Sequence, residues 1–364
     1  MRAEILLLAL SAALPAAAQD TGRPVTFASE QGVRFTVRAA GIQGPRTLFE
    51  SAESDPMPDE WDTVLIQGVL PDPGVTLQVF KAGGSDWEPL TVKRFPGGRF
   101  WAKARTRRAP GSLRLRALDT GVRRSHSVDI YGIEVFVDLP QAPGDSPAPP
   151  RGPEDPAAPR PLIHGRGEWG AAPPTEPYSP DPLVWRITLH HSDGKHTATL
   201  AESRDEARFI QDFHQHGRGW IDIGYHFIVD SMGNILEARP EGVLGAHTLA
   251  NNEGNIGIVL LGTYHRPKFD RPTQAQLDAL VELGRYVVKR YGVDPASLKG
   301  HRDYKKTACP GDKAYVSIEE LRGAFAGGPI PVPPVKKRAQ KAQALLSAAR
   351  SWDGTRAESG QRAK

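Results

Sequence analysis

A proline-rich segment divides this chain into two parts whose hydrophobic patterns differ. Nine prolines lie within residues 140–161, among Ala, Gly and Asp. Such a composition favours extended polyproline II structure and forms a semi-rigid spacer, not a packed element. A chain of 364 residues has room for two or three domains of roughly 100–200 residues each. We therefore predict a linker over residues 140–161 between two folded domains, residues 24–139 and 162–327.

Before the linker, apolar and polar residues alternate in short runs, for example in residues 75–79, 113–116 and 133–137. Residues 71–74, which contain two prolines, an aspartate and a glycine, mark one of the turns between such runs. Alternation with a period of two indicates half-buried β-strands. We therefore predict that this first domain is all-β and sandwich-like.

Three tryptophans of the first domain are its most informative side chains. Trp61, Trp87 and Trp101 either pack in the core, which we expect for most of them, or form a sugar-binding face. The second possibility would make the first domain a carbohydrate-binding or adhesion unit that delivers the second domain to its target.

The pattern after the linker switches between helical and strand-like segments. Two capping-box sequences, Ser203-x-x-Glu206 and Thr273-x-x-Gln276, precede apolar residues at helical spacing. Gly292 stands where a helix that begins after Thr273 would end. These signals predict an α/β domain. Its predicted strands are residues 185–190, 225–229 and 256–261, and a third helix is predicted over residues 317–325.

The chain begins with the features of a secretory signal peptide over residues 1–18. Arg2 is followed by an almost wholly apolar run, residues 5–14, and then by Ala-x-Ala at residues 16–18. The run is too short to cross the ~30 Å hydrocarbon layer of a membrane. We predict cleavage after Ala18 and export to the periplasm or the extracellular space. No later segment reaches the ~20 apolar residues of a transmembrane helix, so we expect none in the mature chain.

The net charge of +4 is unevenly distributed. Residues 336–364 carry eight Lys or Arg and two acidic residues, so this segment is +6 and the rest of the chain is −2 (+4 minus +6). The basic character therefore belongs to the tail and gives no reason to expect that the protein binds nucleic acid. We predict a flexible tail over residues 328–364, which either solubilises the chain or contacts anionic polymers of the cell envelope.

Cys309 is the only cysteine of the chain. An intramolecular disulfide, a Cys₄ or Cys₂His₂ zinc finger and a cysteine-ligated iron–sulfur cluster are therefore excluded. His301 lies eight residues earlier, and the intervening loop is rich in turn-forming residues, so both side chains can reach one metal ion. On spacing alone another interpretation stays open, in which Cys309 is a small buried residue and His301 a surface histidine.

The adjacent histidines His190 and His191 are the best candidates for a third ligand, because they stand at the end of a predicted strand. Side chains alternate across a strand, so only one of the two can face a given site. His190 shares its face with Arg186 and Thr188, and this polar face suits a solvent-accessible site. We therefore choose His190. A zinc ion with three protein ligands keeps a coordination position for water, which is typical of catalytic zinc sites.

Seven short motifs follow one another in the second domain and resemble those of a known family. They are Glu168-Trp169-Gly170-Ala171, Ile187-Thr188-Leu189-His190-His191-Ser192, Gly219-Trp220-Ile221-Asp222-Ile223-Gly224-Tyr225-His226-Phe227, Gly245-Ala246-His247-Thr248, Ile256-Gly257-Ile258, Gly300-His301-Arg302-Asp303 and Ala308-Cys309-Pro310-Gly311. In this order they resemble the zinc-dependent N-acetylmuramoyl-L-alanine amidase family, which includes the peptidoglycan recognition proteins and the phage-type amidases. The resemblance covers most of residues 162–327 and none of the first domain.

The resemblance implies a central mixed β-sheet flanked by helices, with one Zn²⁺ ion bound on one face. It also implies hydrolysis of the amide between N-acetylmuramic acid and the L-alanine of peptidoglycan. The family's zinc ligands fall on His190, His301 and Cys309, its catalytic tyrosine on Tyr225, and a helper residue on Thr307.

The resemblance also implies substrate-binding roles. His247 and Asn252 match residues of the family that contact muramyl peptides, but Asn251 replaces the tyrosine that precedes the asparagine in the family. Non-catalytic members lack the cysteine. Because Cys309 is present, we favour an enzyme, and a non-catalytic peptidoglycan-binding module is the alternative.

The remaining histidines receive structural roles. We expect His191 and His226 to pack on the sheet face opposite the metal site. His214 and His216 lie near the end of a predicted helix, where a partly positive side chain interacts favourably with the helix dipole.

Overall fold

The computed structural model describes residues 23–24, 33–37, 46–120, 126–138, 159–265 and 270–333. The predicted signal peptide, most of the predicted linker and the tail beyond residue 333 lie outside the described residues. Among the residues that are described, no helix combines the length and the apolar character needed to cross a lipid bilayer.

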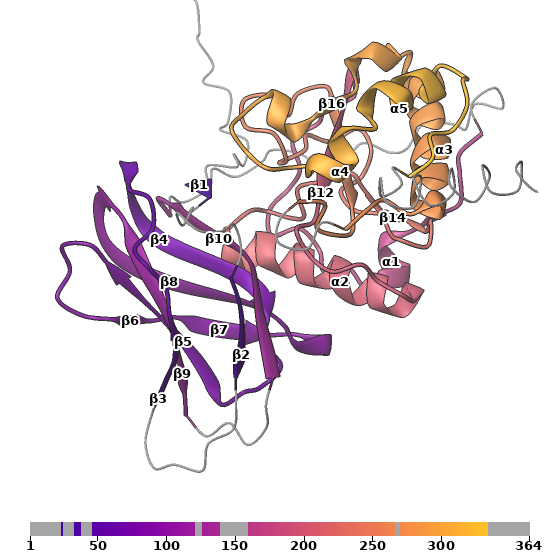
Figure 1. Ribbon diagram of the computed structural model, residues 1–364. Coiled ribbons are helices and arrows are strands. Elements are labelled where there is room, and N and C mark those ends of the chain that lie inside the picture. Colours follow the sequence, from indigo (N-terminus) through magenta and orange to yellow (C-terminus); the bar gives the residue numbers. More distant parts are fainter. Residues whose placement is uncertain are drawn as a thin grey trace, which may run out of the picture.

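The first half of the described chain forms antiparallel β-sheets. Its strands are β1 (Arg23–Pro24), β2 (Val33–Val37), β3 (Arg46–Glu50), β4 (Met57–Val69), β5 (Val75–Lys81), β6 (Glu88–Pro89), β7 (Thr91–Arg94), β8 (Arg99–Gly111), β9 (Leu113–Asp119) and β10 (His126–Phe136). One sheet has the order β1-β10-β4-β8-β7, with β2 also paired to β10, and the other has the order β3-β9-β5-β6 (Figure 1). Apolar residues of both sheets, such as Val64, Phe100, Leu77 and Leu115, form one buried cluster. This confirms the prediction of an all-β, sandwich-like region.

The tryptophans of this region divide between two environments. Trp61 is 1% exposed inside the cluster between the sheets, and Trp101 is buried where the β-sheets meet the second half of the chain. Trp87 is half-buried and packs against Phe80, with 5.7 Å between the ring centroids. The expectation of core packing for most of these tryptophans is confirmed.

The second half of the described chain is α/β. Its elements are β11 (Ile163–His164), α1 (Arg166–Trp169), β12 (Arg186–His191), α2 (Leu200–Asp212), β13 (Phe227–Val229), β14 (Ile235–Glu237), β15 (Asn255–Leu260), α3 (Gln274–Tyr291), β16 (Lys299–Gly300), α4 (Asp312–Tyr315) and α5 (Ile318–Phe325). A π-helical turn over Phe213–Gly217 extends α2. Short 3₁₀ turns cover Pro295–Ser297 and His301–Asp303 in this half, and Pro96–Gly98 between β7 and β8 in the first half.

The six strands of this half form one mixed sheet, in the order β11-β14-β13-β15-β12-β16. Only β13 and β14 pair in an antiparallel manner; the other neighbours are parallel. Helices α3 and α5 pack with Leu189 and Ile258 on one face, and α2 packs with Ile228 and Val259 on the other (Figure 1). The predicted central mixed sheet flanked by helices is confirmed.

The ends of helix α3 follow the prediction. Thr273 is its N-cap, and its hydroxyl oxygen accepts a hydrogen bond from the backbone N–H of Gln276 at 3.0 Å. Gly292 ends the helix in the left-handed region, with φ 66°, which glycine adopts without the steric penalty of a Cβ atom.

The predicted start of helix α2 was wrong by one turn. Thr199 caps the helix by accepting a hydrogen bond from the backbone N–H of Glu202, and the Glu202 carboxylate accepts from the N–H of Ala198. The helix therefore begins one turn before Ser203, with Thr199 as its N-cap. Ser203 and Glu206 repeat the same pattern one turn later, but both are buried inside the helix. Their polar atoms consequently need partners elsewhere in the protein.

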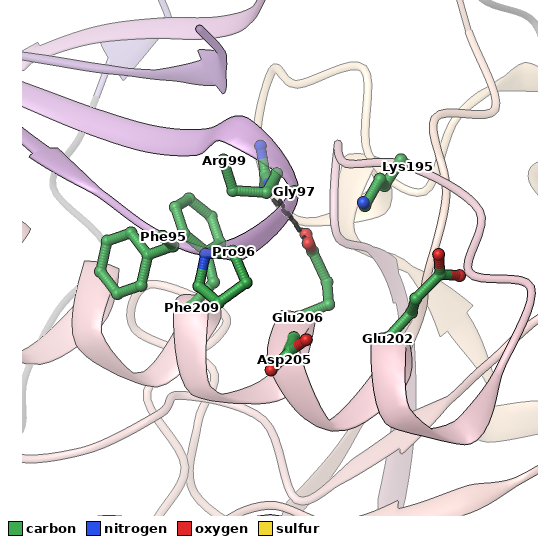
Figure 2. A pocket seen from close by; sticks show the side chains of 9 residues that line it. All are labelled: Phe95, Pro96, Gly97, Arg99, Lys195, Glu202, Asp205, Glu206 and Phe209. Atoms are coloured by element: carbon green, nitrogen blue, oxygen red, sulfur yellow. Dashed lines mark hydrogen bonds and ion pairs between the residues drawn. The ribbon is translucent and has the colours of Figure 1, made fainter. Parts of the chain in front are cut away.

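Glu206 finds its partner in the β-sheets. Arg99, the first residue of β8, donates two hydrogen bonds to the Glu206 carboxylate, at 3.0 Å from Nε and 2.8 Å from Nη2 (Figure 2). The two side chains are 2% and 1% exposed. The guanidinium also lies over the ring of Phe209, 3.8 Å from its centroid. A buried bidentate ion pair therefore joins the two halves of the described chain.

Apolar and polar contacts extend this interface along α2. Leu65, Trp101 and Phe136 of the β-sheets share a buried cluster with Phe209 and other residues of α2 and the adjoining sheet face. The indole N–H of Trp101 donates to Asp212 at 2.9 Å. The two halves are therefore packed against each other over a common core.

Candidate metal centre

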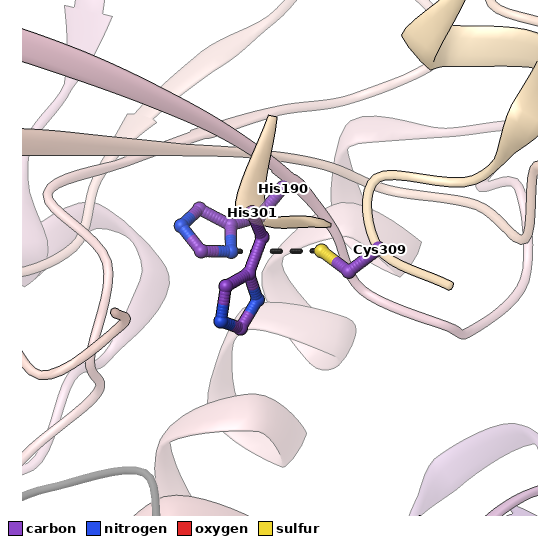
Figure 3. A group of neighbouring side chains, drawn as sticks. All are labelled: His190, His301 and Cys309. Atoms are coloured by element: carbon purple, nitrogen blue, oxygen red, sulfur yellow. Dashed lines mark hydrogen bonds between the residues drawn. The ribbon is translucent and has the colours of Figure 1, made fainter. Parts of the chain in front are cut away.

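Three side chains that are distant in sequence converge at one point (Figure 3). His190 lies near the end of β12, His301 directly follows β16, and Cys309 lies before α4. One possible ligand atom from each lies within 4.8 Å of the others. The Nδ1 atom of His190 is 3.6 Å from the sulfur of Cys309, and the two imidazole rings are 4.6 Å apart between centroids. The predicted grouping of these three residues is therefore present.

The sheet and one loop bring these residues together. Strand β16 pairs with β12 in parallel, with Gly300 opposite Leu189, so the residues that follow them emerge side by side. The backbone N–H of Arg302 donates to the carbonyl of Cys309 at 3.0 Å and closes the loop between the two ligands. The Asp303 carboxylate accepts from the N–H of Gly300 at 2.9 Å and from the hydroxyl of Tyr315, which fixes the start of this loop.

A chain of hydrogen bonds sets the tautomer of His190. The carbonyl of Asn255 can only accept, so the Nε2–H of His247 donates to it at 3.0 Å. The Nδ1 atom of His247 is then an acceptor for the Nε2–H of His190, also at 3.0 Å, and it lies 2.9 Å from the hydroxyl of Thr248 as well. This leaves the lone pair of the His190 Nδ1 atom on the side of Cys309. Such a partner on the far nitrogen is the usual arrangement for a metal-binding histidine.

The electrostatic environment keeps these imidazoles neutral. Burial lowers the pKa of His190 well below its ordinary value, and the nearby His301 and His247 lower it further. Burial also lowers the pKa of His247 well below its ordinary value. A neutral imidazole retains the lone pair that a metal ion needs, so His190 can serve as a ligand at neutral pH.

The geometry fits a zinc ion. In tetrahedral coordination, typical bond lengths of about 2.0–2.1 Å to nitrogen and 2.3 Å to sulfur place these two atoms about 3.5–3.6 Å apart. The distance between His190 Nδ1 and Cys309 Sγ is 3.6 Å. His190, His301 and Cys309 are 1%, 6% and 8% exposed. A buried set of two imidazoles and a thiol is consistent with a zinc site of three protein ligands.

Two further residues implied by the family resemblance lie beside this set. The ring of Tyr225 is 5.1 Å from the ring of His190 between centroids, and Tyr225 is half-buried. The hydroxyl of Thr307 accepts a hydrogen bond from the backbone N–H of Cys309 at 3.3 Å. Tyr225 therefore lies next to His190, and Thr307 helps to hold the backbone of Cys309.

The two residues expected to contact substrate lie inside the protein. His247 is 3% exposed and Asn252 is 6% exposed. The side-chain oxygen of Asn252 accepts from the backbone N–H groups of His247 and Thr248, at 2.9 and 2.7 Å. Asn252 therefore holds the segment that carries His247, and His247 holds His190. Their contact with substrate stays a prediction.

The polar face of β12 is buried around His190 and not open to solvent as expected, and His190 on that face lies with His301 and Cys309. Thr188 is fully buried, and its hydroxyl donates to the side-chain oxygen of Asn255 at 2.9 Å. The face was polar because its side chains form hydrogen bonds within the protein. Trp169 and Trp220, at 0% and 5% exposed, also belong to the interior.

The other histidines differ in outcome. His191 packs against Tyr264 and His265 on the face opposite His190, as expected. The expectation for His226 was wrong, because its ring lies 5.7 Å from that of His247, on the same face as His190. His214 was missed as a neighbour of the site: it accepts from the N–H of Gly224, and its ring lies 5.6 Å from that of Tyr225. The only available signal was its position a few residues before the motif that contains Tyr225.

The second half of the chain is similar to known proteins. Residues 180–312 match the family model of N-acetylmuramoyl-L-alanine amidases. Peptidoglycan-recognition protein SC2 of Drosophila simulans is 34% identical over 158 residues, which are 43% of this chain and 84% of that protein. The N-acetylmuramoyl-L-alanine amidase of Homo sapiens is 34% identical over 164 residues, 43% of this chain but only 27% of that protein.

The chain is also similar to solved structures of this kind. Wild-type Drosophila PGRP-LB is 33% identical, with a TM-score of 0.41 over 43% of this chain and 92% of that chain. Peptidoglycan recognition protein-LE, solved in complex with tracheal cytotoxin, is 29% identical, with a TM-score of 0.41 over the same shares.

A mixed sheet that carries a buried cluster of two imidazoles and a thiol defines an α/β domain with a candidate metal site. With the relatives above, this places the chain in a family: it belongs to the peptidoglycan recognition proteins and N-acetylmuramoyl-L-alanine amidases. Both names occur among relatives that are 34% identical to it. The strands before residue 180 lie outside the family match.

Proposed function

We propose that this protein is an exported, zinc-dependent N-acetylmuramoyl-L-alanine amidase that hydrolyses the amide between N-acetylmuramic acid and L-alanine in peptidoglycan. The observation that carries the proposal is the convergence of His190, His301 and Cys309, with Tyr225 beside them. The family contains both enzymes and recognition proteins, so membership alone does not decide between them. The intact ligand set favours the enzyme.

Each residue has a separate task in this proposal. His190 and His301 would hold the metal as neutral imidazoles, and Cys309 would hold it as a thiolate. The chemistry supplied there would be a water molecule of lowered pKa and a polarised carbonyl group. Tyr225 donates a hydrogen bond to the oxygen that gains negative charge as the amide carbon becomes tetrahedral. His247 keeps His190 in its ligand tautomer, and its fixed orientation avoids reorganisation during the reaction.

Export belongs to the proposal because peptidoglycan lies outside the cytoplasm. Its support is the sequence of residues 1–18, in which a basic residue, an apolar run and an Ala-x-Ala site follow one another. Detection of the mature N-terminus after Ala18 in the periplasm or the medium would test it. Retention of residues 1–18 on a cytoplasmic protein would contradict it.

The activity is tested by mass spectrometry of muropeptides after digestion of purified sacculi. We expect wild type to release stem peptides that begin at L-alanine, and we expect Cys309→Ala to release none. Tyr225→Phe should release them far more slowly. Tyr291→Phe is a matched control, since Tyr291 ends α3 on the other side of the sheet and its hydroxyl donates to Glu241. It should retain activity.

A different outcome would support the alternative function. If wild type binds sacculi but releases no stem peptides with zinc present, the protein is a non-catalytic peptidoglycan-binding module. If stem peptides appear but begin at a residue other than L-alanine, the protein cleaves another bond and the proposed specificity is wrong.

A further inference from the structure

A second group of metal-ligand side chains lies on the face of β12 opposite His190. His191, Asp193 and His265 each offer one ligand atom, and these atoms lie within 4.8 Å of one another. His191 is the last residue of β12, and His265 follows β15, which pairs with β12 in parallel. Both segments therefore leave the sheet at the same edge, and this brings the three side chains together.

The distances suit a shared ion. Nε2 of His265 is 3.3 Å from an oxygen of the Asp193 carboxylate, and the rings of His191 and His265 are 5.0 Å apart between centroids. Ligand atoms bound to one divalent ion at about 2.0–2.2 Å lie about 3.0–3.5 Å from one another. The carboxylate and one imidazole already have this spacing, so a small movement of His191 would complete the set.

Two atoms that face this group are also unsatisfied. His191 and His265 are 6% and 7% exposed. Within the part of the chain that the structure describes, Nδ1 of His191 has no hydrogen-bond partner, and neither has the Asp193 carboxylate oxygen that faces Nε2 of His265. A buried polar atom without a partner is destabilising and calls for an explanation, and a metal ion is a partner that imidazole nitrogen accepts readily.

The backbone around these residues is held in place. The N–H of Ser192 donates to the carbonyl of Leu260 at 2.9 Å, and the hydroxyl of Thr263 donates to the carbonyl of Gly194 at 2.7 Å. Asp193 itself has φ 48°, in the left-handed region that residues other than glycine rarely adopt. Such strained positions are concentrated at functional sites.

We propose that His191, Asp193 and His265 form a second metal site, distinct from the zinc centre, which takes a divalent transition-metal ion such as Zn²⁺ or Co²⁺. Two imidazoles and a carboxylate are a ligand set that these ions accept. The ion ties the end of β12 to the loop after β15. A Cβ atom placed on Gly132 of β10 would lie 3.7 Å from the Asp193 carboxylate, so the site adjoins the β-sheets as well. Its role is structural, and it does not depend on the proposed amidase activity.

Cobalt titration of the demetallated full chain separates the two sites. A thiolate ligand gives Co²⁺ a near-ultraviolet charge-transfer band, whereas two imidazoles and a carboxylate do not. We expect wild type to bind two ions, one for each group of side chains, and only one with this band. Cys309→Ala should keep one ion without the band. Adding His265→Gln to Cys309→Ala should lower the affinity for that remaining ion. The loss should exceed the about 10–100-fold that is typical when a residue hydrogen-bonded to a metal ligand is removed.

Controls keep the outcome interpretable. His216→Gln removes a histidine whose side chain is 56% exposed and should change neither stoichiometry nor affinity. Thermal unfolding with and without Co²⁺ gives a second readout: Cys309→Ala should be stabilised by the ion, and Cys309→Ala with Asp193→Asn should not. This comparison also shows whether each metal-free variant is folded.

Two results would overturn the second site. One is a wild type that binds a single ion, with the charge-transfer band. The other is a Cys309→Ala protein whose remaining ion is unaffected by His265→Gln and Asp193→Asn. Either result leaves the amidase proposal intact, because that proposal is tested by product analysis. Conversely, if wild type releases no stem peptides but binds two Co²⁺ ions as described, the amidase proposal fails and the second site stands.

Discussion

Replacing Glu206 with glutamine tests whether the β-sheets and the α/β domain are joined in solution as they are in the structure. The substitution retains the size of the side chain and removes its negative charge. Arg99 would then keep its positive charge at a site where its side chain is 2% exposed. Removing one partner of a buried ion pair destabilises a protein by about 3–5 kcal/mol, because the remaining charge is desolvated without compensation. We expect a loss of this size for Glu206→Gln.

Urea unfolding followed by tryptophan fluorescence measures this loss. Trp101 lies in the interface and is one of seven tryptophans, so the change in total emission includes the loss of this contact. Glu50→Gln is the matched control. Glu50 pairs with Arg114 at 2.8 Å, but these side chains are 38% and 36% exposed, and such surface pairs contribute about 0–1 kcal/mol.

The double variant Arg99→Met, Glu206→Leu provides a further comparison. Replacing both partners of a buried ion pair by apolar residues is often nearly neutral, so this variant should be more stable than Glu206→Gln. If Glu206→Gln is no more destabilising than Glu50→Gln, the Arg99 charge is solvated in the native protein. The interface described above would then be absent in solution.

Three further predictions concern the site and its surroundings. Tyr225→Phe should lower kcat by about 10²–10³-fold with unchanged zinc content, and a loss of zinc would contradict its role as a hydrogen-bond donor. His247→Ala should weaken zinc binding by about 10–100-fold in chelator competition, and unchanged affinity would show that His190 needs no such partner. Burial lowers the pKa of His226 from 6.5 to about 4, so between these pH values the unfolded chain binds more protons than the folded one. The free energy of unfolding should therefore fall, by up to about 3 kcal/mol, as the pH drops from 6.5 to 4. Urea titrations at several pH values should show a shallower fall for His226→Gln. An equally steep fall in both proteins would show that His226 is not the group responsible.

Patterns that depend on near neighbours in sequence predicted much of the fold. The cap at Thr273 and the stop at Gly292 were correct because helix ends are determined by local hydrogen bonds and backbone conformation. The box at Ser203 failed because two overlapping sequences satisfied the same local rule. Only the tertiary structure distinguishes them: Glu206 is drawn inward by Arg99, which is 107 residues away in sequence.

The candidate site was likewise predictable only where its residues depend on local sequence patterns or on the family resemblance. His190, His301 and Cys309 were identifiable from alternation along a strand, one loop and the family resemblance. The sheet face on which His226 lies was not predictable, because it depends on the register between strands. Strand β13 pairs with β15 so that Ile228 lies opposite Val259, and Val259 also lies opposite His190. Likewise, the bond from His190 to His247 spans 57 residues and appears in no local pattern.

Demetallation of the purified mature chain tests the central claim most directly. Release of stem peptides beginning at L-alanine is measured before metal removal, after exhaustive chelation, and after addition of Zn²⁺. The ligand set of His190, His301 and Cys309 predicts that release stops on chelation and returns with Zn²⁺. Full activity in the metal-free chain would contradict the proposed zinc chemistry.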